Sequence, residues 1–197
     1  MEVKCPLCGS SNAQLWTEAE DIEYRTTPDR FHFYHCDRCR VLFIHPVPVD
    51  QLQRIYPPNY YSYNYRSASW VFRIKEFLNR RFLRHWSRKV PGEALSALDV
   101  GGGAGWNLTQ LRQGDRRFQY TQVVDLDEQA AEQAEANGHN FYLGRFEEFA
   151  EDRRFDLILM LNLVEHVENP SQILKKAHEM LNPGGLVLVQ TPNFQCW

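Results

Sequence analysis

The chain has 197 residues, of which 43% are hydrophobic and 24% are charged, and its formal net charge is −3. These values are typical of a globular protein with one substantial core and a small appended unit, and they give no general attraction to nucleic acid. No apolar run approaches the roughly 18 residues of a membrane-spanning helix, and the first residues lack the apolar core of a signal peptide. The composition therefore predicts a cytoplasmic protein with no transmembrane segment.

Four of the five cysteines form two C-x-x-C pairs near the N-terminus. Cys5 and Cys8 make the first pair, and Cys36 and Cys39 make the second. Two such pairs supply the four thiolates of a closed tetrahedral zinc site, and cysteines of cytosolic proteins favour metals over disulfides. We expect a small zinc ribbon with a structural Zn²⁺ in residues 1–45, and a loop or hairpin inserted between the pairs.

Two weaker alternatives concern the same residues. A redox dithiol would also use C-x-x-C cysteines, but two spaced pairs fit a metal better than an exchange motif. Either His32 or His35 could replace one cysteine as a ligand. The fifth cysteine, Cys196, has no partner in the sequence and is expected to be inert.

Residues 46–90 are predicted to be a connector followed by a basic amphipathic helix. Prolines and tyrosines of residues 46–65 predict a loop packed by its aromatic side chains. Apolar residues recur at helical spacing in residues 68–89, and residues 66–89 hold eight Lys or Arg against Glu76, a local charge of 8 − 1 = +7. This face could bind anionic lipid at a membrane surface, nucleotide-sugar or phosphate groups. Alternatively, the charges are simply solvated, and the Trp and Phe side packs over the ligand pocket of the next unit.

From residue 91 onward, strand and helix patterns alternate, which predicts a parallel sheet with crossover helices. The expected helices lie at 106–113, 128–137 and 171–181, and the expected strands lie at 95–100, 120–125, 141–143, 155–161 and 186–191. Residues 182–185, Asn-Pro-Gly-Gly, predict a helix stop and tight turn before the last strand.

A glycine-rich turn follows the first of these strands, with the pattern Asp99-x-Gly101-x-Gly103-x-Gly105. Residues without a Cβ let a ligand lie against the backbone N–H groups. The dinucleotide pattern G-x-G-x-x-G would place its third glycine at Trp106, so that fingerprint is not met. A ligand with both an ammonium and a carboxylate suits the acidic residue and the exposed amides, and S-adenosylmethionine is such a ligand.

Asp125 ends the second strand, 20 residues after Gly105. Adjacent parallel strands would place its carboxylate beside the glycine-rich turn, in the geometry that binds two ribose hydroxyls. Asp127 lies where a helix N-cap is expected, so we interpret it as a cap rather than a ligand residue.

Residues 162–166 follow the fourth strand at the carboxyl edge of the sheet, where ligands of open parallel sheets bind. His166 could take a proton from an acceptor and is the candidate general base. The alternative is a histidine that caps a loop or packs on the next helix. A divalent ion held by Glu165 and His166 is a minor alternative.

These motifs in their order resemble class I S-adenosylmethionine-dependent methyltransferases. The resemblance rests on the residues from Asp99 to Gly105, Val124-Asp125, Phe155-Asp156, Val164-Glu165-His166-Val167, Asn182-Pro183-Gly184-Gly185 and Thr191-Pro192-Asn193. The paired cysteines and the tyrosine-rich connector resemble bacterial members with a zinc-binding head, including C-methyltransferases of deoxysugars. The resemblance implies a doubly wound, Rossmann-like α/β fold with strand order 3-2-1-4-5 for residues 91–197.

The resemblance also implies a role for each site residue. Asp99 and the backbone of Gly101 and Gly103 would hold the methionine amino and carboxylate groups, and Asp125 would hold the ribose. Leu126 and Phe146 would flank the adenine, and Asn162 and Leu163 would line the floor near the methyl group. Arg145 departs from the pattern, because related proteins often carry an acidic residue there for the adenine amine.

The sheet is a second departure from the family pattern. The family has a final antiparallel hairpin beside the last parallel strand, and we expect this hairpin to be absent after residue 191. The unit is therefore expected to be C-terminally incomplete. The sequence nevertheless predicts methyl transfer from S-adenosylmethionine to an O, N or C atom of a small molecule, such as a sugar or biosynthetic intermediate. The alternatives are a non-catalytic S-adenosylmethionine-binding module and an RNA methyltransferase. Residues 1–45 are slightly acidic, so nucleic acid is not the expected partner.

Overall fold

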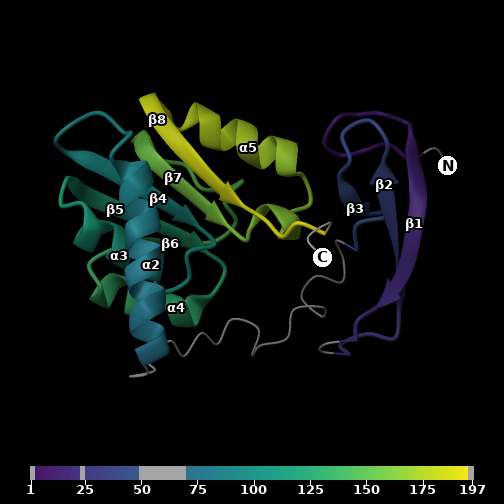
Figure 1. Ribbon diagram of the computed structural model, residues 1–197, viewed down its shortest axis with the longest axis horizontal. Helices are drawn as coiled ribbons and strands as arrows, with labels where there is room; N and C mark the ends of the chain where they lie inside the picture. Colours follow the sequence, from purple (N-terminus) through teal and green to yellow (C-terminus); the bar gives the residue numbers. More distant parts are fainter. Residues whose placement is uncertain (1–2, 23–24, 49–69, 195–197) are drawn as a thin grey trace. The chain divides into compact units, whose positions relative to one another are not determined.

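The computed structural model describes residues 3–22, 25–48 and 70–194 (Figure 1). Contacts divide the chain into two compact units: Met1–Tyr63 with Glu168–Ser171 and Asn193–Trp197, and Asn64–Val167 with Gln172–Pro192. Most of the predicted proline- and tyrosine-rich connector, its tyrosine cluster and Cys196 lie outside the described residues.

The first unit contains a three-stranded antiparallel sheet in the order β1-β2-β3. Its strands are β1 (Ala13–Glu20), β2 (Arg30–Cys36) and β3 (Leu42–Ile44). The β1–β2 hairpin fills the gap between the two cysteine pairs, which confirms the expected insertion.

The second unit is built on a five-stranded sheet in which all pairs of neighbouring strands are parallel. The strands are β4 (Leu95–Val100), β5 (Phe118–Asp125), β6 (Asn140–Leu143), β7 (Phe155–Leu161) and β8 (Leu181–Gln190). Their order is β6-β5-β4-β7-β8. This order is the expected 3-2-1-4-5 arrangement of a doubly wound, Rossmann-like fold, which is therefore confirmed.

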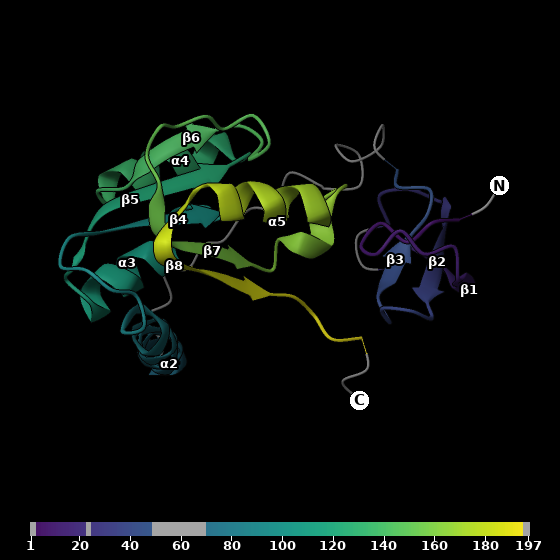
Figure 2. The ribbon, with the colours of Figure 1, turned by 90° about the horizontal axis from the view of Figure 1, so that it is seen from above.

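Helices cover both faces of this sheet. They are α2 (Trp70–Ser87), α3 (Trp106–Gly114), α4 (Glu128–Ala136) and α5 (Pro170–Glu179), with a 3₁₀ turn η2 (Val164–His166). Figure 2 shows α2 and α3 on one face and α5 on the other, and each face has its own cluster of buried apolar side chains. Within the described ranges, no helix is both long enough and apolar enough to cross a bilayer.

The prediction for residues 182–185 was correct for the helix stop but wrong for a turn that precedes the last strand. The helix already ends at Glu179, and the Asn-Pro-Gly-Gly segment lies inside β8 as an irregularity rather than before it as a turn. Phe155 of β7 pairs with Leu181, whereas Leu157 pairs with Leu186, so β8 bulges between these two pairs. The helix stop signal was correct, but β-pairing resumes at once because the Phe155 amide donates to the carbonyl of Met180 at 2.8 Å.

The predicted basic helix is present as α2, but the interpretation that its Trp and Phe side packs inward was correct only for Phe72 and Trp86, which are half-buried. Leu83 and Ser87 are its buried residues, whereas Trp70, Ile74 and Phe77 are exposed. Apolar spacing predicts a helix but does not say which face is buried, because contacts with α3 decide that.

Candidate functional site

The glycine-rich turn connects the buried strand β4 to the first turn of α3. The amide of Gly101 donates to the carbonyl of Val124 in β5 at 2.8 Å, which fixes the start of the turn against the neighbouring strand. Gly101, Gly103 and Gly105 all have positive φ, at 72°, 50° and 74°. A side chain would be strained in these conformations, so the three alternating glycines are explained by the backbone path itself.

Asp99 lies beneath this turn and is only 1% exposed. Its Oδ2 atom finds no hydrogen-bond partner among the described residues. A Cβ on Gly102 would lie 2.7 Å from the Asp99 Cγ, so Gly102 must be a glycine for the carboxyl group to fit. The sequence pattern singled out the alternating glycines and missed Gly102, although the run Gly101-Gly102-Gly103 was the available signal.

Burial raises the pKa of Asp99 to about 7, and the negative charge of Asp125 adds to this increase, while a hydrogen bond with Asn107 opposes it. Because no hydrogen-bond donor reaches the buried Oδ2, a positive charge placed nearby would stabilise the ionised form of the Asp99 carboxylate. The turn and Asp99 together therefore fit a ligand that places an ammonium group close to the backbone.

Asp125 lies directly beside the turn, at the end of β5. Its Oδ2 accepts the Gly103 amide at 2.7 Å, and its Oδ1 accepts the Asp127 amide at 3.0 Å. The side chain is partly exposed, and each oxygen keeps a second lone pair for a ligand hydroxyl. Asp127 accepts the Gln129 amide at 2.9 Å and caps α4, which confirms its predicted role.

Leu163 and Asn162 follow β7 at the same edge of the sheet. Leu163 Cδ1 lies 3.1 Å from the position of a Cβ on Gly101, so it borders the turn. Asn162 has a φ of 57°, and its amide donates to the Gln190 carbonyl at 2.8 Å. His166 ends η2 with an exposed side chain, and its amide donates to the Leu163 carbonyl at 2.9 Å.

The two residues expected beside the adenine differ in accessibility. Leu126 is exposed next to Asp125, whereas Phe146 is 4% exposed and stacks with Phe149 in the core on the α5 side of the sheet. Arg145 is exposed, and its guanidinium lies 3.7 Å from Glu147 Oε1. Phe146 is therefore not brought to the surface with the other predicted residues.

His139 is a buried residue of the site region that the sequence analysis did not identify. Its Nε2 and Nδ1 lie 2.9 and 2.8 Å from the hydroxyls of Thr109 and Thr121. A Cβ on Gly105 would overlap the imidazole ring, so His139 packs directly against the glycine that precedes α3. Burial lowers the pKa of His139 to about 4, and the charge of Arg112 contributes to the decrease.

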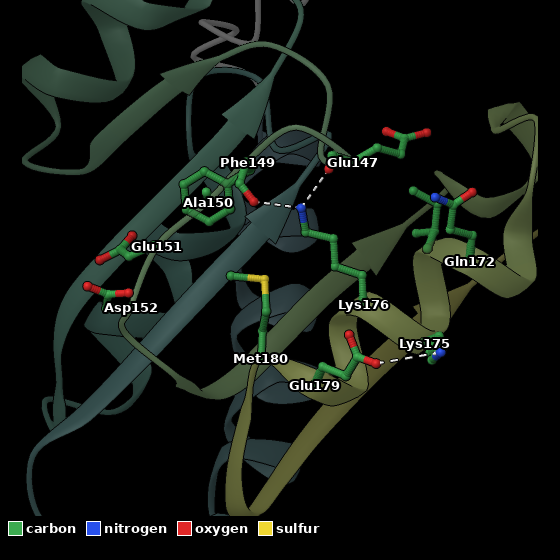
Figure 3. A pocket seen from close by; sticks show the side chains of 11 residues that line it. Glu147, Phe149, Ala150, Glu151, Asp152, Gln172, Lys175, Lys176, Glu179 and Met180 are labelled. Carbon is green, nitrogen blue, oxygen red and sulfur yellow. Dashed lines mark hydrogen bonds and ion pairs between the residues drawn. The ribbon is translucent and has the colours of Figure 1, made fainter.

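A hollow of about 650 Å³ lies between α5 and residues 147–152 (Figure 3). Lys176 extends across it and donates to the carbonyls of Glu147 and Phe149 at 2.8 and 2.6 Å. None of the site residues predicted from the sequence lines this hollow, so it is separate from the glycine-rich turn.

The four paired cysteines come together in the first unit. Their sulfur atoms lie within 4.8 Å of one another, with Cys5–Cys39 at 3.5 Å and Cys8–Cys36 at 3.6 Å. A tetrahedral zinc with bonds of about 2.3 Å would separate its sulfur ligands by about 3.8 Å, so the cluster fits that ion. Each pair forms the same turn, since the amides of Gly9 and Arg40 donate to the carbonyls of Cys5 and Cys36 at 2.9 and 2.8 Å.

A family model described as a methyltransferase domain matches residues 69–196. The chain belongs to this methyltransferase family. The resemblance to class I S-adenosylmethionine-dependent methyltransferases, drawn from the motif order, is thereby confirmed.

The names of curated relatives agree with this membership. The chain is 32% identical over 131 residues to a ubiquinone biosynthesis O-methyltransferase of Azorhizobium caulinodans, covering 61% of the chain and 49% of the relative. A relative of the same name from Caulobacter sp. strain K31 is 33% identical over 130 residues, covering 61% of the chain and 50% of the relative. The chain thus spans about half the length of the curated relatives it matches.

Two solved structures share the fold. The plantazolicin methyltransferase BpumL in complex with SAH has a TM-score of 0.53 at 22% identity, covering 66% of the chain and 52% of that protein. The SAM-bound amino pentose methyltransferase CalS10 from Micromonospora echinaspora has a TM-score of 0.51 at 20% identity, covering 68% of the chain and 55% of that protein. At these identities the likeness establishes the fold alone.

Proposed function

We propose that the protein transfers the methyl group of S-adenosylmethionine to a small-molecule acceptor. The observation that carries this proposal is the turn after β4, with the buried Asp99 below it and Asp125 bonded to the Gly103 amide beside it. Family membership of the same residues supports the choice of ligand.

We assign different parts of the cofactor to the turn and to β5. We assign the methionine ammonium and carboxylate to Asp99 and to the backbone at Gly101, Gly103 and Gly105. Asp125 receives the two ribose hydroxyls, because its carboxylate is partly exposed and is held in place by two backbone amides. A carboxylate fixed in this way loses little conformational freedom when it binds a diol.

The remaining predicted residues form the rest of the pocket. Of Leu126 and Phe146, we assign contact with the adenine to Leu126, because Phe146 is buried. Asn162 and Leu163 would border the reacting methyl group, since Leu163 lies against Gly101.

Bound S-adenosylmethionine supplies an electrophilic methyl group on a positively charged sulfur. The chain contributes alignment of the acceptor and exclusion of water, which are the main requirements of such a transfer. We assign His166 as the base that removes a proton from the acceptor, because its exposed side chain follows Asn162 and Leu163 at the same edge. The names of the curated relatives favour an oxygen atom as the methylated position.

Calorimetric titration with S-adenosylmethionine and with its demethylated product tests the binding part of the proposal. We expect both to bind, and we expect Asp125→Ala to weaken each by about tenfold or more, because two hydrogen bonds to a charged group are lost. Gln113→Ala, an exposed position on α3, is the matched control. Methyl transfer from labelled cofactor to phenolic and sugar acceptors tests the reaction, and binding without transfer to any acceptor would favour a non-catalytic module.

We also propose that the cysteine cluster holds a structural Zn²⁺. Four thiolates leave no open position for a substrate, so the ion would stabilise the fold of the small unit rather than take part in methyl transfer. A reducing compartment such as the cytoplasm would keep these thiols available for the metal.

A further inference from the structure

α2 packs against α3 with a largely polar face. Two nitrogens of the Arg80 guanidinium, Nε and Nη2, donate to the Gln110 Oε1 at 3.2 and 3.1 Å. Asn79 Nδ2 donates to the Asn107 Oδ1 at 3.2 Å. Leu83 is the large apolar side chain that this face buries completely. The inward side of the helix is therefore already satisfied by contacts within the unit.

The opposite face of α2 exposes large apolar side chains. Along one side of the helix, successive members lie four, three, one and four residues apart. They are Trp70 (72% exposed), Ile74 (47%), Phe77 (63%), Leu78 (56%) and Phe82 (40%). A contiguous exposed stripe of this kind marks an interaction surface.

Positive charge accompanies this stripe. Arg81 and Arg84 continue the same exposed face toward the C-terminal end of α2, and Arg73 and Lys75 are exposed beside the apolar residues. The one acidic residue of α2 is Glu76, which points to the buried side and accepts from Gln110 Nε2 at 3.3 Å. The outer face of α2 thus presents apolar and cationic groups and no carboxylate.

We propose that this face of α2 docks on the surface of a bilayer that contains anionic lipids. An interfacial helix places apolar side chains among the acyl chains while its cations remain at the phosphate level, so both kinds of group on α2 are used at once. Nucleic acid would attract the arginines but would leave Ile74 and Leu78 in water. A protein partner that covered the apolar stripe would also have to pair or desolvate Arg81 and Arg84.

The orientation of α2 gives this docking a consequence for the site. Phe72 in its first turn lies 6.2 Å, between ring centroids, from Trp106, the residue that follows Gly105. Arg80, two turns later, contacts Gln110, so α2 and α3 run in the same direction. The apolar end of α2 is therefore the end beside the glycine-rich turn, and docking would hold that turn close to the bilayer.

Flotation of the full chain with lipid vesicles tests the proposal. We expect binding to vesicles of phosphatidylcholine mixed with an equal amount of phosphatidylglycerol, weakened by salt, and little binding to phosphatidylcholine alone. Phe77→Ser with Leu78→Ser should reduce binding by about tenfold or more, because two side chains no longer enter the acyl region. Ile22→Ser, which also removes an exposed apolar side chain but from the first unit, should bind like the wild type.

A second variant and a second signal keep the test independent of folding defects. Arg81→Glu with Arg84→Glu should abolish the preference for anionic vesicles, whereas Arg116→Glu, another exposed arginine, should not. Emission of Trp70 should shift to shorter wavelength with anionic vesicles, and the shift should disappear in Trp70→Phe.

Three results would overturn the proposal: no binding to either vesicle, binding that the α2 variants do not change, or an α2 surface that instead mediates self-association or RNA binding. These readouts do not involve methyl transfer. The docking proposal and the proposed enzymatic activity can therefore fail separately.

Discussion

The carboxyl group of Asp99 lies directly beneath Gly102, so closely that a Cβ on this glycine would stand 2.7 Å from the Asp99 Cγ. The contact excludes water from the carboxyl group and leaves its Oδ2 without a hydrogen-bond partner among the described residues. A buried carboxyl oxygen without a hydrogen-bond partner lowers the stability of a folded protein, so its presence here indicates a functional requirement.

Replacement of Asp99 by Asn should stabilise the ligand-free protein and weaken cofactor binding. The pKa of Asp99 is about 7 in the folded protein against 3.8 in the unfolded chain, so the folded state binds more protons between these pH values. Stability from this group consequently falls as pH rises through that window, and an amide avoids the loss. At about pH 8 we expect the free energy of unfolding of Asp99→Asn, measured by urea denaturation, to be about 2 kcal/mol higher than that of the wild type. A variant less stable than the wild type at this pH would contradict the expectation.

The affinity for the demethylated cofactor should fall as the solution is acidified. Below a pH of about 7 Asp99 becomes neutral and no longer attracts an ammonium group. Between about pH 8 and about pH 5.5 we expect an affinity loss of about tenfold or more, measured by calorimetry. Asp99→Asn should bind weakly with little pH dependence over this range, and an equally steep profile in that variant would assign the effect to another group.

Alanine substitutions at Gly102 and Gly103 should both lower stability, but for different physical reasons. Gly102→Ala places a methyl group against Asp99, so the turn or the carboxyl must move, and we expect a loss of stability of about 2 kcal/mol or more. Gly103→Ala meets no atom within 4 Å and carries only the strain of its φ of 50°, about 1–2 kcal/mol. Thermal unfolding measures both. Combining Gly102→Ala with Asp99→Gly should recover part of the loss, whereas no recovery would rule out the proposed overlap.

His139 should make the protein sensitive to acid. Its pKa is about 4 in the folded protein against 6.5 in the unfolded chain, so the unfolded state takes up a proton first as pH falls. The stability from neutral His139 is complete above about pH 6.5 and is lost as the pH falls toward 4. His139→Gln should be less stable at neutral pH, because the bonds to Thr109 and Thr121 are altered, but should lose less further stability on acidification. Urea denaturation at several pH values provides the comparison, and parallel curves for the two proteins would contradict it.

Removal of zinc should unfold the small unit without unfolding the large one. The described residues of the first unit form a three-stranded sheet with few fully buried side chains, whereas the second unit has two buried apolar clusters of its own. We expect one zinc per chain by elemental analysis, a large loss of metal in Cys36→Ser, and retention in the control Cys196→Ser. After chelation, the main thermal transition should persist. A protein purified without metal but fully folded in residues 3–48 would argue against a structural zinc.

Local chemistry explains which features could be predicted from the sequence. Strand and helix periodicity, two cysteine pairs and the order of motifs predicted the parallel sheet, the hairpin between the pairs and the neighbourhood of Asp99, Gly103 and Asp125. Each of these depends on spacing along the chain. The cap at Asp127 was predictable for the same reason, because its bond to Gln129 is local.

Tertiary packing decided the rest. The outward direction of the apolar stripe on α2, the burial of Phe146, the bulge in β8 and the support of Gly105 by His139 all depend on residues distant in sequence. A periodic pattern defines two faces of a helix but not which of them meets a neighbour, and a glycine in the sequence does not reveal what lies beneath it. Sequence therefore determined the family, the elements and the candidate ligand residues, whereas only the packed structure decided which side chains are buried and which surface remains available to a partner.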